Sequence, residues 1–262
     1  MRRPESRGRP APTALVVAHP GHELRVFGWM ERVRPTVFVL TDGSGSTAQS
    51  RLDTTARLLA ATSASRGSLF GRFTDRALYS ALIDGRTDLL LDAAFELADA
   101  LRACRIEVVA GDAAEGFNPG HDVCRFILDA AVRLATDGAS PLRNLEFSLV
   151  DAPGALAGAT DVECVELDPP ALARKLAAAA AYEELRVEVD QAIASFGAVA
   201  FAREVLAPAR TAAAVRLWDD EPPFYERHGQ RRVAEGVYGE ALTWADHVRP
   251  ASEALLLAGV PA

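Results

Sequence analysis

The 262-residue sequence predicts an α/β protein with a Rossmann-like, three-layer fold, in which helices cover both faces of a mostly parallel sheet. Two observations carry this prediction. Short apolar runs rich in β-branched residues alternate with longer segments of helical periodicity. Three of these runs also end abruptly in polar, glycine-containing loops, as buried parallel strands do where their carboxyl ends open into a crevice.

The order of the elements follows from periodicity and from the turn residues between them. We expect strands over 14–18, 36–40, 106–110, 144–150 and 162–167, and helices over 23–32, 50–62, 75–84, 89–103 and 121–135. An alanine-rich, mostly helical segment is expected from 168 to 208, and the pattern weakens after it.

These boundaries divide the chain into three parts. Residues 1–12 read as a disordered, basic N-terminal arm, and residues 13–208 as the α/β domain. Residues 209–262 read as a C-terminal helical or irregular arm that packs on the same domain, either as a lid or as the subunit interface of a homo-oligomer.

Composition limits the classes of partner. Hydrophobic residues make up 49% of the chain and charged residues 24%, which is typical of a soluble globular protein. The formal net charge of −8 argues against nucleic-acid binding, and no apolar run has the roughly 18–20 residues that a membrane span needs. We therefore expect a cytoplasmic protein with a small-molecule substrate and with no nucleic-acid or membrane partner. The abundance of alanine and the single lysine, Lys175, indicate a GC-rich bacterial genome.

Three of the five histidines come directly after predicted strands: His19 and His22 follow the first, and His121 follows the strand over 106–110. Since parallel strands bring their carboxyl ends to one edge of a sheet, these imidazoles are expected to converge. Three protein nitrogens with an open fourth position are typical of a catalytic zinc. The same donors also suit Fe²⁺, Co²⁺ or Ni²⁺. The three cysteines show no C-x-x-C spacing, so no thiolate zinc site is expected.

The turn Ala18-His19-Pro20-Gly21-His22-Glu23 resembles the Ala-His-Pro-Asp-Asp-Glu signature of the PIG-L/LmbE-like zinc-dependent de-N-acetylases. Thr41-Asp42-Gly43 is similar to that family's Thr-(Asn/Asp)-Gly, and Asn118-Pro119-Gly120-His121 to its His-Pro-Asp-His. The resemblance extends over about 13–206. It implies that His19, His22 and His121 bind the metal, and that Arg51 contacts the substrate.

The sequence departs from the family pattern at the general base, at one metal ligand and at the residue that stabilises the oxyanion. Gly21 stands where the family has its general base, His22 replaces an acidic ligand, and Asn118 replaces the histidine that stabilises the oxyanion. A site of three neutral histidines leaves the metal charge less compensated and makes bound water more acidic. Asn118 still offers a hydrogen-bond donor to an oxyanion.

Either the metal alone handles the proton, or a replacement base is found among the loop carboxylates Glu115, Asp42, Asp112 and Asp122. Glu115 is the first choice, because flanking glycines free its loop to enter the crevice. Asp42 is alternatively a turn carboxylate. We expect Asp122 to orient a ligand or stabilise a helix N-terminus, and Glu23 to support the histidine turn.

The sequence thus predicts a metal-dependent hydrolase that removes an N-acetyl-like group from a small sugar-like or amine-containing metabolite. Two alternatives remain: a different metal-dependent reaction on the same scaffold, and a non-catalytic member that binds a ligand.

Overall fold

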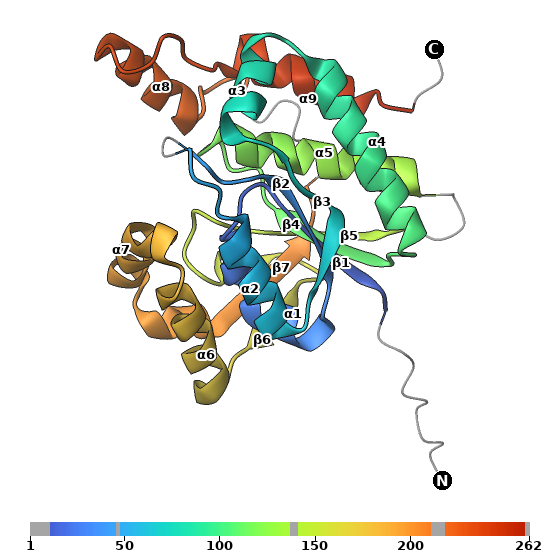
Figure 1. Cartoon of the computed structure of the whole chain (residues 1–262), viewed down its shortest axis with the longest axis vertical. Helices are drawn as coiled ribbons and strands as arrows, with labels where there is room; N and C mark the ends of the chain where they lie inside the picture. The colour runs from blue at the N-terminus through green and yellow to red at the C-terminus, as the bar shows by residue number, and fades with distance from the viewer. Residues whose placement is uncertain (1–10, 46–47, 137–140, 211–217, 260–262) are drawn as a thin grey trace.

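A computed structural model describes residues 11–45, 48–136, 141–210 and 218–259. The predicted disorder of the N-terminal arm concerns residues that lie almost entirely outside this part of the chain. Figure 1 shows a sheet at the centre of the molecule with helices above and below it.

The sheet has seven strands in the order β3-β2-β1-β4-β5-β7-β6. The strands are β1 (Thr13–Val17), β2 (Thr36–Thr41), β3 (Ser65–Phe73), β4 (Val108–Asp112), β5 (Arg143–Phe147), β6 (Glu163–Glu166) and β7 (Arg203–Pro208). Strands β1 to β5 pair in parallel, whereas β7 runs antiparallel to β5 and to β6. The predicted α/β fold with a mostly parallel sheet is confirmed.

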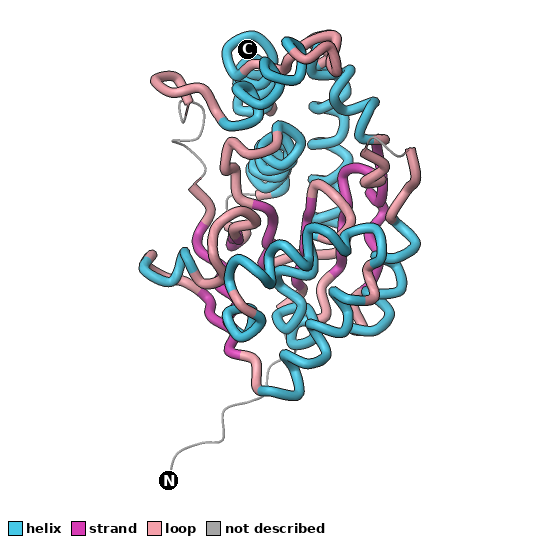
Figure 2. Tube along the Cα trace, turned by 90° about the vertical axis from the view of Figure 1, so that its left-hand side faces the viewer, coloured by secondary structure: helices cyan, strands magenta, loops and turns pink. Residues whose placement is uncertain are grey.

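Helices cover both faces, as the view in Figure 2 also shows. The α-helices are α1 (Phe27–Val33), α2 (Leu52–Thr62), α3 (Asp75–Ile83), α4 (Thr87–Ala103), α5 (Pro119–Ala135), α6 (Pro169–Ala180), α7 (Arg186–Phe196), α8 (Phe224–Ala234) and α9 (Arg249–Leu256). Short 3-10 turns connect them: η1 (His22–Val26), η2 (Ala155–Gly158), η3 (Glu183–Leu185) and η4 (Ala198–Ala202), with one π-helical turn, η6 (Trp244–Val248).

Strand β1 lies in the middle of the sheet and is buried on both faces. Because side chains alternate along a strand, Val16 packs with α4 and α5 on one face, while Leu15 and Val17 pack with α1 and α2 on the other. Strand β1 pairs with β2 on one side and with β4 on the other. The direction of strand succession therefore reverses between β1 and β4, where open α/β sheets form their ligand crevices.

Two strands were not predicted. Strand β3 is an edge strand with the polar sequence SRGSLFGRF and two register shifts against β2, so its alternation is irregular. Strand β7 is short and follows the alanine-rich helical stretch, where the sequence analysis predicted a mostly helical segment up to Pro208. Both strands are defined by long-range pairing more than by local pattern.

The C-terminal arm packs on the layer of α4 and α5. Its residues Trp244, Val248 and Leu255 are buried in the same core as these two helices. Whether the arm also acts as a lid or as a subunit interface remains a prediction. None of the helices in the described residues is long and apolar enough to cross a bilayer.

Candidate metal centre

The three histidines singled out in the sequence meet at the crevice between β1 and β4. His19 and His22 follow β1, and His121 lies in the first turn of α5, the helix reached from β4. Their ring centroids are 5.2 Å apart for His19 and His22, 5.0 Å for His19 and His121, and 4.5 Å for His22 and His121. The expected convergence is therefore present, and the parallel strands are its cause.

His19 is oriented from two neighbouring segments of the chain. Its Nδ1 lies 2.7 Å from Thr41 Oγ1 and 3.1 Å from Asp75 Oδ1. Thr41 ends β2, and Asp75 begins α3 directly after β3. The other ring nitrogen, Nε2, is buried without a hydrogen-bond partner among the described residues. A buried ring nitrogen without a hydrogen-bond partner is suited to bind a ligand.

His22 is oriented by Asp112, the last residue of β4. Asp112 Oδ2 lies 2.7 Å from His22 Nδ1 and accepts a hydrogen bond of 2.8 Å from the backbone nitrogen of Ala18. Burial raises the pKa of Asp112 to about 7. A carboxylate on Nδ1 leaves Nε2 of the imidazole free, which is the arrangement of carboxylate–histidine–metal sites.

The donor chemistry fits a divalent transition metal. Burial lowers the pKa of His22 and of His121 well below the ordinary value, so both rings are neutral at pH 7, the form that binds metals. In the described part of the chain, however, no three His, Cys, Asp or Glu side chains are so placed that they could hold a metal ion. The three histidine rings instead lie in edge-to-face contact with one another.

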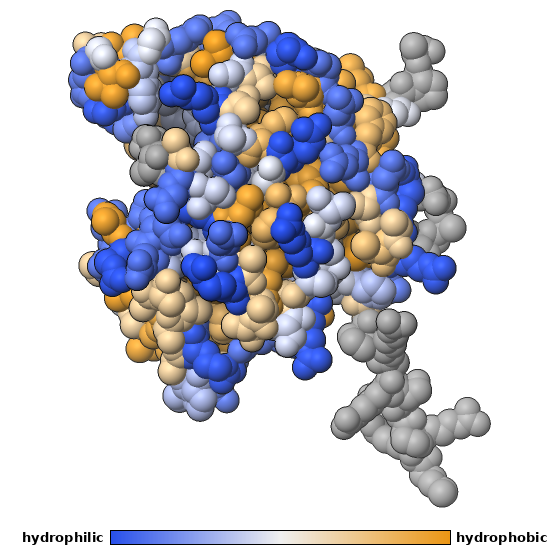
Figure 3. Space-filling model, viewed as in Figure 1, coloured by the Kyte–Doolittle hydropathy of each residue, from blue (hydrophilic) through white to orange (hydrophobic). Residues whose placement is uncertain are grey.

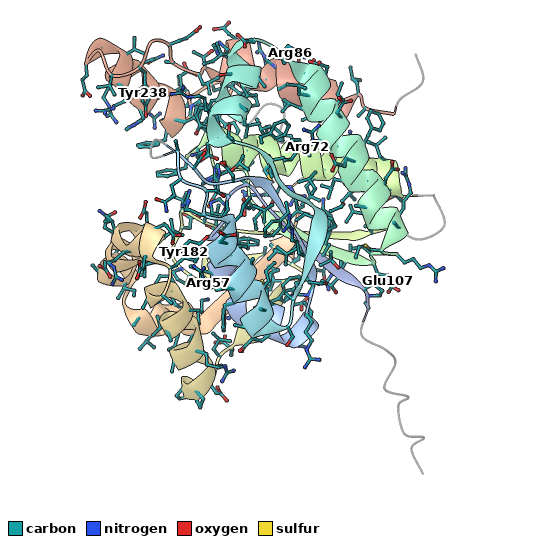
Figure 4. The ribbon with its side chains drawn as sticks, viewed as in Figure 1. Arg57, Arg72, Arg86, Glu107, Tyr182 and Tyr238 are labelled. Carbon is teal, nitrogen blue, oxygen red and sulfur yellow. The ribbon has the colours of Figure 1, made fainter. Side chains whose placement is uncertain are left out.

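Glu23 stabilises the turn that carries His19 and His22 through hydrogen bonds of its buried carboxylate. Its Oε2 accepts a hydrogen bond of 2.7 Å from the backbone nitrogen of Gly21, and its Oε1 one of 2.6 Å from Thr55 Oγ1 on α2. Thr55 Oγ1 also lies 2.9 Å from Tyr182 Oη. Figure 4 shows Tyr182 beside α2, which carries the labelled Arg57. Glu23 is fully buried, and burial raises its pKa.

Asn118 is fixed at the N-terminus of α5. Its Oδ1 accepts hydrogen bonds from the backbone nitrogen of Gly120 at 2.7 Å and from Tyr79 Oη at 3.1 Å. With the amide oxygen engaged, the Nδ2 group remains the donor that can face a substrate oxygen. This orientation is compatible with the predicted role in oxyanion binding.

The carboxylate of Glu115 points to the loop after β5. It accepts hydrogen bonds from Ser148 Oγ at 2.5 Å, from the backbone nitrogen of Leu149 at 2.9 Å and from that of Val150 at 3.2 Å. These bonds favour loop anchoring over the role of general base that the sequence analysis predicted.

Asp42 and Asp122 also organise loops. Asp42 Oδ1 accepts from the backbone nitrogen of Ser44 at 3.0 Å and from its hydroxyl at 2.7 Å, the pattern of a turn carboxylate. Asp122 Oδ1 accepts from the backbone nitrogens of Glu115 and Gly116 at 2.9 and 3.2 Å. Among the described residues neither carboxylate contacts an imidazole nitrogen, whereas Asp75 and Asp112 both contact one.

A cavity of about 590 Å³ opens beside the histidines. His22 and His121 line it together with Arg51, whose Nε donates a hydrogen bond of 2.5 Å to the carbonyl oxygen of Gly43. No carboxylate among the described residues pairs with Arg51. Glu188 of α7 is the only acidic residue among the described residues that line the cavity, and Glu115 is not among them.

Sequence reasoning missed Asp75 and Glu188, and it named Thr41 only as part of a motif, without its contact with His19. Thr41 is the last residue of β2 and Asp75 follows β3, a strand that gave no clear signal in the sequence. Glu188 lies on a helix far along the chain whose position over the crevice depends on tertiary packing. Asp112 was named as a candidate base, but its contact with His22 was not foreseen.

The fold and the histidine cluster define the class of protein: a Rossmann-like α/β protein with a candidate metal centre at the switch point of its sheet. No protein-family model and no curated protein matches the sequence. Among solved structures, the fold is similar to a deacetylase–bog complex from the biosynthesis pathway of teicoplanin, with a TM-score of 0.50 and 14% identity over 89% of this chain and 95% of that chain. The zinc-inhibited form of teicoplanin deacetylase Orf2 aligns with a TM-score of 0.49 and 11% identity, over 89% and 96% of the two chains. At these identities the likeness concerns the fold alone.

Proposed function

We propose that this protein is a metal-dependent hydrolase that cleaves the N-acyl amide of a small sugar-like or amine-containing metabolite. The observation that carries the proposal is the convergence of His19, His22 and His121, with Asp75 and Asp112 on the Nδ1 atoms of the first two. The fold shared with a deacetylase and the resemblance of the His19–Glu23 turn to a de-N-acetylase signature support it.

His19, His22 and His121 are the residues that would hold zinc, which when bound supplies Lewis acidity and an acidic water. Asn118 would donate its Nδ2 hydrogen to the amide oxygen as negative charge develops there. Arg51, which pairs with no carboxylate among the described residues, would bind the polar or anionic part of the substrate.

We further propose that Glu188 replaces Glu115 as the proton acceptor. Glu188 lies three residues after Leu185, hence on the same side of that helical segment, and Leu185 contacts the Gly21 position. Glu188 lines the cavity without an ion pair among the described residues, so its carboxylate is available, whereas that of Glu115 is engaged by the 148–150 loop.

The test is amide hydrolysis by the zinc-loaded protein, measured as free amine released from N-acetylglucosamine and from other N-acyl amines. We expect zinc-dependent turnover, and a loss of about a thousandfold or more in kcat/KM for His121→Ala. His228→Ala removes a histidine on α8 and is the matched control, expected to keep full activity. Equal activity of both variants, or no turnover of any N-acyl amine, would contradict the proposal.

A further inference from the structure

The cavity beside the histidines is mostly lined by apolar side chains. Its apolar lining comes from four segments: η1, the loop after β5, α6 and α7, with Phe117 and Phe201 in addition. A volume of about 590 Å³ lies within the range of roughly 300–1,000 Å³ that is common for small-molecule sites. This volume far exceeds what an acetyl group needs.

Helix α7 presents an apolar stripe to this cavity. Leu185, directly before the helix, and Val189, Ile193 and Phe196 within it recur at helical spacing, and all four line the cavity. The stripe extends over roughly 16 Å, given the rise of 1.5 Å per residue. No residue of α7 is fully buried, so the fold itself does not cover the stripe.

Apolar residues from two other segments also line the cavity. Leu149 and Val150 face the cavity from the loop after β5, and Leu176 and Ala179 from α6. On the outer surface that Figure 3 shows, tan and orange residues over α6 and α7 lie among blue, hydrophilic ones.

Three cationic side chains line the cavity: Arg25, Arg51 and Lys175. Two of them, Arg25 and Lys175, already donate hydrogen bonds to acceptors of the protein. Lys175 Nζ donates to Glu204 Oε1 at 2.8 Å and to the carbonyl oxygen of Arg25 at 3.0 Å. Arg25 donates to the carbonyl oxygens of Ser148 and Asp151. The interior of the cavity therefore offers a ligand apolar contact, and Arg51, which has no ion pair among the described residues, lies near the histidines.

We infer that the acyl group of the substrate is a long linear alkyl chain that lies along α7, with its amide at the histidines. The inference deepens the proposed function and rests on it for the position of the amide. The apolar stripe of α7 and the two histidines His22 and His121 line one continuous cavity. One substrate molecule can therefore contact the stripe with its alkyl chain and the histidines with its amide.

Binding measurements test the proposed alkyl-chain site without requiring turnover of the substrate. The probes are N-acetyl-, N-hexanoyl- and N-decanoylglucosamine, titrated calorimetrically into the zinc-loaded protein. A buried methylene tightens binding by up to about fourfold. We therefore expect the decanoyl compound to bind on the order of a hundredfold more tightly, or better, than the acetyl compound.

A matched pair of variants on α7 tests whether the alkyl chain of the substrate binds along this helix. Ala192 lines the cavity, whereas Ala194 is exposed and does not. Ala192→Phe is expected to remove most of the increase in affinity from the hexanoyl to the decanoyl compound. The affinity for the acetyl compound is expected to stay unchanged, which also reports that the variant is folded. Ala194→Phe is expected to behave as wild type.

Affinity independent of chain length, or equal effects of the two variants, would overturn the inference. Failure of the proposed function has a different signature. In that case the decanoyl compound binds tightly and Ala192→Phe weakens it, but no N-acyl amine is hydrolysed. Hydrolysis of N-acetylglucosamine without any chain-length effect would overturn the alkyl-chain inference alone.

Discussion

The side chain of Leu185 occupies the space that a side chain on Gly21 would need, since its Cδ1 is the atom nearest to a Cβ built at that position. Gly21 also has a φ of 108°, in the region that L-residues rarely adopt. Gly21 stands where the resembling family carries its general base. Leu185 and the backbone together keep that position free of a side chain, so in the proposed reaction this position supplies no base.

The first prediction concerns this contact. Gly21→Ala is expected to lower the free energy of unfolding by at least about 2 kcal/mol, because backbone strain and overpacking add. Gly85→Ala is the control: its φ is 62°, but no atom of the described residues lies within 4 Å of its Cβ position, so only the backbone cost of about 1 kcal/mol remains. Denaturant unfolding of both variants measures the difference, and equal destabilisation would refute the steric account.

The second prediction separates Glu188 from Glu115. Glu188→Gln is expected to lower kcat by about a hundredfold or more while leaving the melting temperature unchanged. Glu115→Gln is expected to retain kcat but to lose about 1–3 kcal/mol of stability, since hydrogen bonds to a charged carboxylate are weakened. Steady-state kinetics and thermal unfolding of the two variants provide the readouts. The reverse pattern would restore Glu115 as the base.

The third prediction concerns the carboxylate that orients His22. Asp112→Asn is expected to weaken zinc binding by about 10–100-fold, because the amide no longer offers a charged acceptor to His22 Nδ1. Asp42→Asn alters a carboxylate that binds only the turn at Ser44 in the described structure and should leave zinc affinity unchanged. Competition with a chelator of known affinity measures both. An unchanged affinity for Asp112→Asn would remove this residue from the site.

The fourth prediction concerns the support of the site from α6. Lys175 and Glu204 form a buried ion pair of 2.8 Å, and Glu204 also accepts from the backbone nitrogens of Gly28 and Trp29. Lys175→Met leaves a buried carboxylate without its cation and should cost about 3–5 kcal/mol of stability. The neighbouring Arg174 pairs with Glu31 at the surface, so Arg174→Met should change the melting temperature little. Similar losses for the two variants would contradict the burial argument.

The sequence was informative where local pattern and topology agree. Buried strands ending in His19, His22 and His121 sufficed to predict the parallel sheet and the meeting of the three rings. The strands β3 and β7 were missed because an edge strand with polar residues and a short antiparallel strand are defined by their partners. The roles of the carboxylates were equally non-local: Glu115 contacts residues 148–150, and Glu188 reaches the cavity through the packing of α7.

The central claim is that the three histidines form one metal site, and metal stoichiometry tests it most directly. Protein expressed with ample zinc, iron, cobalt and nickel is purified, and its metal content is measured by mass spectrometry. We predict about one equivalent of a divalent transition metal in wild type and in His228→Ala, and a loss of that metal in His19→Ala, His22→Ala and His121→Ala. Metal-free wild-type protein, or retention of the metal in all three of these variants, would contradict the account.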